Sequence, residues 1–203
     1  MQTRSVSTLV LVIVFSIGIS LSAMAQDSGG QKSTPSKAPE KSQVAGVSMD
    51  SKFVKEAAGG GLAEVEKGNL AKSKASNDAV KQFGDRMVTD HSKANDELKS
   101  LASSKGWQLP TEMPPHEKSM HTQLSKLSGV AFDKAYISDM VRDHEKDVAA
   151  FKKCAANCSD PDLKAWAQKT VPTLEDHLKM AKDAASQVGV STTAEKDTAS
   201  LEH

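Results

Sequence analysis

The chain has 203 residues, of which 26 are basic and 26 are acidic, so its formal net charge is zero. A balanced charge argues against nucleic acid or an anionic membrane surface as the main partner. One tyrosine and two tryptophans leave little aromatic surface for stacking on bases or sugars. We therefore expect no nucleic-acid partner. Protein partners stay open, with a homodimer among the possibilities.

The first 25 residues have the features of an export signal. Arg4 supplies a positive charge, an apolar run covers residues 9–19, and Ser22–Ala25 offers an A-x-A cleavage site. The apolar run is short for a membrane span, and no second run follows. We therefore predict a signal peptide over residues 1–25, no transmembrane segment in the mature chain, and a periplasmic or secreted protein.

Two segments of low complexity flank the part that we expect to fold. Residues 26–49 are rich in Ser, Lys, Pro and Gly, and we predict a disordered linker there. Residues 189–203 form a similar tail, in which residues 201–203 match the remnant of an expression tag. The remaining residues 50–188 are enough for one domain with a hydrophobic core.

Apolar residues recur every three or four positions from residue 50 to about residue 187, which predicts helices and no strand. Ser76, Asn77 and Asp78 are residue types suited to the start of a helix, Gly106 is typical of the position after one, and Pro161 is typical of a first helical turn. In chain order we expect long helices over residues 50–73, 79–105, 130–156 and 161–187, with a short helix over residues 116–127 between the second and third.

The links between these helices predict how the helices are connected. Short links follow the first and third long helices, which predicts two antiparallel hairpins. The link between the hairpins carries its own helix and is long enough to cross a bundle. We therefore predict an all-α fold, a ferritin-like four-helix bundle with a short crossover helix; an up-down bundle with a decorated loop is the alternative. Residues 87–93 and 140–146 are identical at five of seven positions, which supports two related hairpins.

Three histidines carry most of the functional information. His91, His144 and His177 each follow an aspartate, and each lies near the midpoint of a long predicted helix on its apolar face. Glu64 lies near the midpoint of the first helix. Helix midpoints meet at one level of a bundle, so we expect all four side chains to share the core. A buried imidazole is costly unless it is paired or ligated, and imidazole suits Zn, Cu and Fe.

Two methionines bear on which metal this site would take. Met87 and Met140 lie four residues before His91 and His144, hence on the same helix faces. Thioethers beside imidazoles favour copper, although methionine is also ordinary core filler. A di-iron carboxylate centre fits less well, because no histidine has a glutamate three residues before it. The alternatives are a buried metal-free hydrogen-bond network and half-exposed histidines. The predicted metal ligands are Glu64, His91, His144, His177, Met87 and Met140.

Cys154 and Cys158 are the only cysteines. In an oxidising compartment two such residues usually pair, and helical i, i+4 spacing brings their Cα atoms within disulfide range. We predict a disulfide between them, with a redox dithiol or soft-metal pair as the alternative. No nucleophile elbow or phosphate-binding loop is present in the sequence, so we expect binding without turnover rather than an enzyme.

Four segments resemble a bacterial family of exported proteins of unknown function: residues 60–68 (GGLAEVEKG), 90–95 (DHSKAN), 143–146 (DHEK) and 172–178 (PTLEDHL). That family is grouped with ferritin-like folds and often labelled as outer membrane proteins. The resemblance covers about residues 53–185 and implies export and a helical bundle, but no reaction; the cysteine pair departs from it. The sequence therefore predicts an exported protein that binds Cu, Zn or Fe, in envelope stress protection. A metal-free structural or protein-interaction module is the alternative.

Overall fold

The computed structural model describes residues 40–191, and of residues 40–48 only the backbone. The predicted signal peptide, most of the predicted linker and residues 192–203 of the tail lie outside this range. The described part contains five helices and no strand, which confirms the all-α fold. The helices are α1 (Glu40–Lys74), α2 (Asp78–Lys105), α3 (Pro115–Ser125), α4 (Gly129–Asn157) and α5 (Pro161–Val188).

The boundaries of α2 and the start of α5 agree with the capping residues that mark them in the sequence. The side chain of Asn77 accepts hydrogen bonds from two backbone amides of α2, and Gly106 ends this helix in the left-handed conformation with φ 69°. Asp160 caps α5 in the same way as Asn77, with Pro161 in the first turn. Side chains therefore satisfy amides that the first turn of each helix leaves free.

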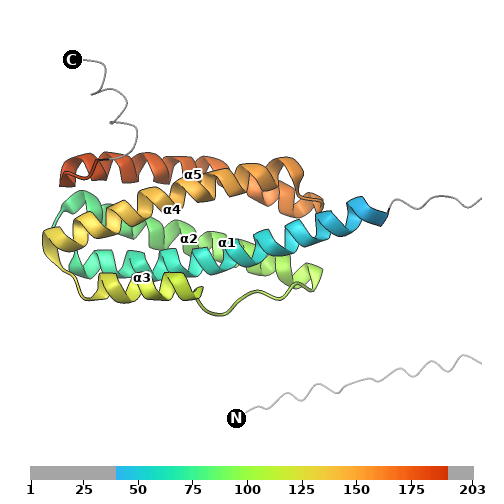
Figure 1. Ribbon diagram of the computed structural model, residues 1–203, viewed down its shortest axis with the longest axis horizontal. Coiled ribbons are helices and arrows are strands. Elements are labelled where there is room, and N and C mark those ends of the chain that lie inside the picture. The colour runs from blue at the N-terminus through green and yellow to red at the C-terminus, as the bar shows by residue number, and fades with distance from the viewer. Residues whose placement is uncertain (1–39, 192–203) are drawn as a thin grey trace, which may run out of the picture. The chain divides into compact units, whose positions relative to one another are not determined.

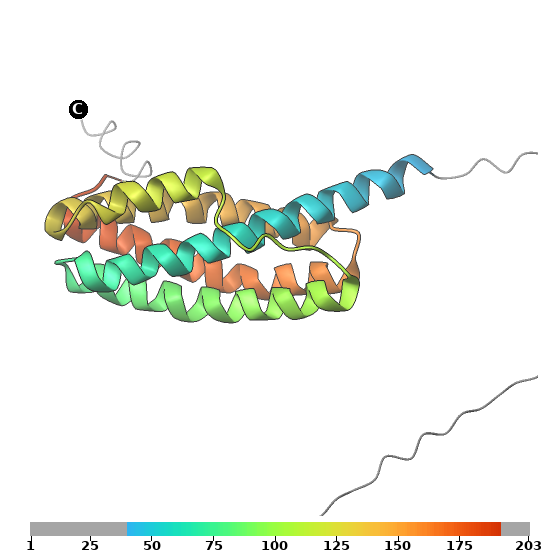
Figure 2. The same cartoon turned by 90° about the horizontal axis from the view of Figure 1, so that it is seen from below.

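The start of α1 differs from the prediction. α1 begins at Glu40, well before the expected start at Asp50, so part of the segment predicted to be a linker is helical. Its sequence contains Glu, Lys, Gln and Ala but no proline after Pro39, so nothing in it stops a helix. The first turns of α1 extend beyond the other helices in both views (Figures 1 and 2).

The helices form two antiparallel hairpins, α1–α2 and α4–α5 (Figure 1). The segment between the hairpins runs back along the bundle, and its helix α3 packs on α1 and α4 (Figure 2). As a result α2 and α4 run in the same direction, while α1 packs against α4 and α2 against α5. Two antiparallel hairpins joined by one long crossover is the arrangement that the link lengths predict.

The hydrophobic core is divided in two along the bundle axis. One apolar cluster surrounds Phe83, Tyr136 and Met140, and the other surrounds Phe53 and Trp166. On the four long helices, five buried polar residues fall between the residues that contribute to these two clusters: Glu64, Lys67, His91, His144 and His177. The middle of the bundle is therefore a polar layer, and the candidate site lies in it.

The two helices of the first hairpin approach each other closely at glycines. A Cβ added at Gly84 would lie 2.6 Å from the Cβ of Ala71, and one added at Gly68 would lie 2.8 Å from the carbonyl oxygen of Gly84. Both distances are shorter than van der Waals contact. The absence of these side chains therefore sets the spacing between α1 and α2.

The disulfide forms between Cys154 and Cys158 at the C-terminal end of α4, with 4.6 Å between the two Cα atoms. Both residues are buried beside Phe151 and Leu163 in the second apolar cluster. None of the helices in the described range carries an apolar stretch long enough to cross a lipid bilayer.

Candidate metal centre

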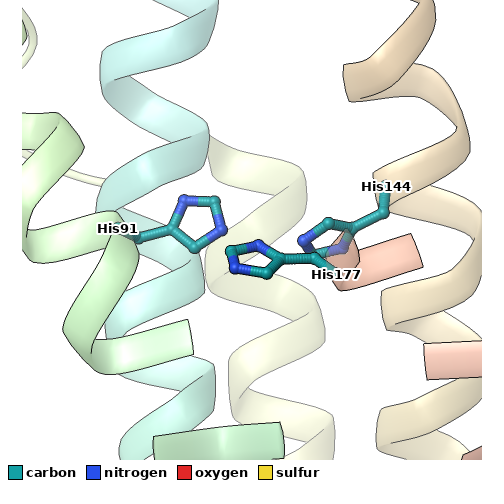
Figure 3. Close-up of side chains that lie close together, drawn as sticks. All are labelled: His91, His144 and His177. Carbon is teal, nitrogen blue, oxygen red and sulfur yellow. The ribbon is translucent and has the colours of Figure 1, made fainter. Parts of the chain in front are cut away.

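Three imidazole rings meet at the centre of the polar layer (Figure 3). His91 comes from α2, His144 from α4 and His177 from α5, and their ring centroids are 5.3 to 5.7 Å apart. Their exposed fractions are 7%, 0% and 1%. One nitrogen from each ring lies within 4.8 Å of the other two. The rings thus form a nearly equilateral triangle that is closed to solvent.

The hydrogen bond of His144 fixes which of its nitrogens carries the proton. Nδ1 lies 3.0 Å from the backbone carbonyl oxygen of Met140. A carbonyl oxygen can only accept, so Nδ1 donates and Nε2 carries a lone pair. Within the described part of the chain, Nε2 is buried and has no hydrogen-bond partner. His144 therefore offers a metal-ligating nitrogen.

His177 is oriented by an acid on another helix. Its Nε2 lies 2.9 Å from Oδ2 of Asp90, which also forms an ion pair with Arg86. Because the carboxylate accepts, Nε2 donates and Nδ1 keeps its lone pair. This Nδ1 is buried without a hydrogen-bond partner among the described residues, as is Nε2 of His91. A carboxylate that holds the far nitrogen of an imidazole is the usual support of a metal-ligating histidine.

All three imidazoles are held in the neutral form. Burial lowers the pKa of His144 to about 3, aided by the nearby His177 and opposed by the hydrogen bond to Met140. Burial also lowers the pKa of His91 well below its ordinary value, and that of His177 despite its bond to Asp90. Leaving a buried polar atom without a partner costs about 1–3 kcal/mol. The site therefore holds three buried nitrogens without a partner among the described residues, one from each ring, and those of His144 and His177 are unprotonated.

The spacing of these nitrogens fits a metal ion after a small contraction. Zinc binds imidazole nitrogen at about 2.0–2.1 Å, so tetrahedral ligands lie about 3.3 Å apart. From separations of up to 4.8 Å, each ring would move inward by at most about 0.8 Å. Rotation about the broad terminal torsion of histidine can supply such a shift. Three nitrogens would leave a fourth position open, as in catalytic zinc sites.

The structure brings together three of the six predicted ligands. Glu64 joins no group with the histidines; its Oε1 lies 3.9 Å from Nζ of Lys67. Met87 and Met140 are fully buried in the neighbouring apolar cluster. Met140 also accepts a hydrogen bond from Nδ1 of His144 through its backbone carbonyl.

Sequence reasoning missed a second feature of the polar layer, the buried Lys67. This side chain is 0% exposed, and its Nζ lies 2.8 Å from Glu117, 2.9 Å from Asp139 and 2.9 Å from Asp143. Burial lowers the pKa of Lys67, but the surrounding carboxylates outweigh it and hold the pKa above its ordinary value. The three carboxylates are close enough together to suit a metal ion, yet the ammonium of Lys67 is already their cation. The sequence feature that could have revealed this buried lysine is its position three residues after Glu64, which places the two side chains on the same face of α1.

These features define a helical-bundle protein with a buried three-histidine cluster. Residues 33–184 match the family described as "Domain of unknown function (DUF4142)", which is most of the chain, so the chain belongs to that family. This confirms the predicted membership of a family of unknown function. No curated protein matches the chain.

Among solved structures, the chain is similar to a crystal structure described as "putative secreted protein DUF305 from Streptomyces coelicolor". The TM-score is 0.61 at 14% sequence identity, over 70% of this chain and 94% of that one. At this identity the likeness concerns the helical fold alone.

Proposed function

We propose that the protein is an exported, ferritin-like bundle that binds one transition metal ion through His91, His144 and His177. The observation that carries the proposal is the convergence of three buried, neutral imidazoles, each with one buried nitrogen that has no hydrogen-bond partner in the described residues. Binding a metal would remove the desolvation cost of all three nitrogens at once. Asp90 would hold His177 in the required orientation.

The donor set narrows the choice of metal. Three neutral nitrogens suit copper and zinc, and iron(II) follows with lower affinity in the usual order for divalent ions. A site without thiolate and with an open position favours exchangeable binding over a closed structural site. Export is supported by the signal-like residues 1–25 and by the disulfide, which persists in oxidising compartments. The role that we propose is metal binding in the cell envelope under stress, without turnover.

The test is elemental analysis of protein purified from the exported fraction without a histidine tag, followed by titration with Cu(I), Zn(II) and Fe(II). We expect about one metal ion per chain, lost in the His91→Ala/His144→Ala variant. The matched control is His121→Ala, since His121 lies on α3 outside the three-histidine cluster. A folded wild-type protein that takes up none of the three metals would contradict the proposal.

A metal-free structural or interaction module is the second candidate, and the Lys67 network is the observation in its favour. A fully buried ion-pair network can specify how helices pack, as single buried polar residues do in coiled coils. On this reading the histidines would belong to the same polar layer and serve only its packing. The titration separates the two candidates, because only the first requires a metal that depends on the histidines.

A further inference from the structure

A pocket of about 310 Å³ lies between α1, α3 and α4, on the side of the bundle that contains Lys67. One lysine, Lys146, is among its lining residues. The lining is strongly acidic, with the five carboxylates Glu56, Glu64, Glu117, Asp143 and Asp147. Such a lining attracts cations and raises their local concentration.

Two of these acids lack a full partner. The ammonium of Lys67 donates hydrogen bonds to Asp139 and Asp143, both at 2.9 Å, and forms an ion pair with Glu117 at 2.8 Å. Glu64, at 3.9 Å, lies outside hydrogen-bond distance of that ammonium, and its Oε2 is buried with no partner among the described residues. Asp147 lies one turn beyond Asp143 on α4 and lines the same pocket. Glu64 and Asp147 are thus the surplus carboxylates of the layer.

The electrostatics agree with this geometry. Burial raises the pKa of Glu64 to about 8, against the charge of Lys67 and with a contribution from Asp147. Burial and the neighbouring Asp143 raise the pKa of Asp147 to about 7. Two buried acids that form no hydrogen bond with a cationic side chain in the described residues would both be stabilised by a bound cation.

This pocket adjoins the histidine centre. A smaller cavity of about 40 Å³ is lined by His91, His177 and Asp90. Gly60 and Asp147 line both spaces, and a Cβ added at Gly60 would meet nothing within 4 Å. The other residues that line both are Glu56, Ala57 and Phe151. The acidic pocket and the histidine cavity therefore share one wall.

We propose that the acidic pocket is a cation-binding site in which Glu64 and Asp147 are the ligands, and that divalent metal passes from it to the three histidines. Transfer of the metal to the histidines rests on the function proposed above, whereas cation binding in the acidic pocket does not. Carboxylate oxygens hold divalent ions such as Mn²⁺. Imidazoles prefer later transition metals, so a metal captured in the pocket would be transferred inward.

The test of the route is the rate of metal uptake. Stopped-flow mixing with Co²⁺, followed by its visible absorption, is applied to the wild type and to Glu64→Gln/Asp147→Asn. We expect uptake to be slower by about tenfold at low salt, with the same final stoichiometry and a smaller difference at high salt. Glu66→Gln is the matched control, because Glu66 is exposed on the same helix and lines neither space. Gly60→Leu should also slow uptake, and Gly60→Ala should not.

The test of the pocket itself uses Mn²⁺ alone, with the free ion measured by electron paramagnetic resonance. Wild type and His91→Ala/His144→Ala should bind Mn²⁺ equally, and Glu64→Gln/Asp147→Asn should not bind it. If Glu64→Gln/Asp147→Asn and Gly60→Leu take up Co²⁺ at the wild-type rate, the proposed transfer from the pocket is wrong. That result would not contradict metal binding by the three histidines. A wild type that takes up no Co²⁺ would overturn the proposed function and the route together. Mn²⁺ binding that survives loss of both carboxylates would overturn the pocket.

Discussion

Replacing Lys67 by methionine tests how the polar layer is held together. Methionine keeps the unbranched chain up to its last carbon but removes the ammonium that Glu117, Asp139 and Asp143 contact at 2.8 to 2.9 Å. Removing one partner of a buried ion pair typically costs 3–5 kcal/mol, since it leaves uncompensated charge. With three acids left, we expect the free energy of unfolding at pH 7 to fall by at least about 3 kcal/mol. The whole domain is stabilised by only about 5–15 kcal/mol.

The loss of stability in Lys67→Met should depend on pH in a definite direction. Without the ammonium, the buried carboxylates have pKa values above those of the unfolded chain, so the folded state loses stability as pH rises. The penalty is therefore smallest near pH 4 and largest above pH 7. The assay is urea unfolding followed by circular dichroism at pH 5 and pH 7. Lys146→Met is the control, because the Lys146 side chain is 68% exposed at 3.5 Å from Asp143 and should cost under about 1 kcal/mol. A Lys67→Met protein within 1 kcal/mol of wild type at pH 7 would refute the reasoning.

Three further predictions concern Glu64, Asp90 and the disulfide. The pKa of Glu64 is raised to about 8 in the folded state, so its burial lowers the free energy of unfolding as pH rises from about 4.5 to 8. Glu64→Gln should therefore stabilise the metal-free protein at pH 8 but not at pH 4, as measured by urea titration. Asp90→Asn replaces the charged acceptor that orients His177 by a neutral amide, and it should weaken metal binding by about 10- to 100-fold with unchanged stoichiometry. Competition with a chelator measures the affinity, and Asp85→Asn on the exposed face should leave it unchanged. Reducing the disulfide should lower the free energy of unfolding by about 2 kcal/mol, because the disulfide closes a very short loop. A decrease above 4 kcal/mol would show that Cys154 and Cys158 do more than hold the end of α4 together.

The sequence predicted correctly those features of the site that depend only on where a residue lies on its own helix. His91, His144 and His177 meet because each lies at the midpoint of a helix on its apolar face, and midpoints meet whichever way helices run. Periodicity does not say which neighbour a face will meet, so Glu64 turned toward Lys67, α3 and α4 rather than toward the imidazoles.

Pairings between helices were the part that the sequence could not supply. Asp90 orients His177 on α5 rather than its own neighbour His91, because adjacent residues on a helix point about 100° apart. Lys67 was missed because a lysine is almost never fully buried unless it is paired, and its partners come from two other helices.

The two halves of the polar layer deal with buried polar groups in opposite ways. On the side of α1, α3 and α4, three carboxylates surround an ammonium that the chain itself provides. On the side of α2, α4 and α5, three neutral imidazoles come together, and each keeps one buried nitrogen that has no hydrogen-bond partner among the described residues. α4 supplies both sides from adjacent positions, Asp143 and His144. A polar layer that served packing alone could place a side-chain donor beside the imidazoles, just as it places the ammonium of Lys67 beside the carboxylates. The nitrogens left without one therefore favour a cation that comes from outside the chain.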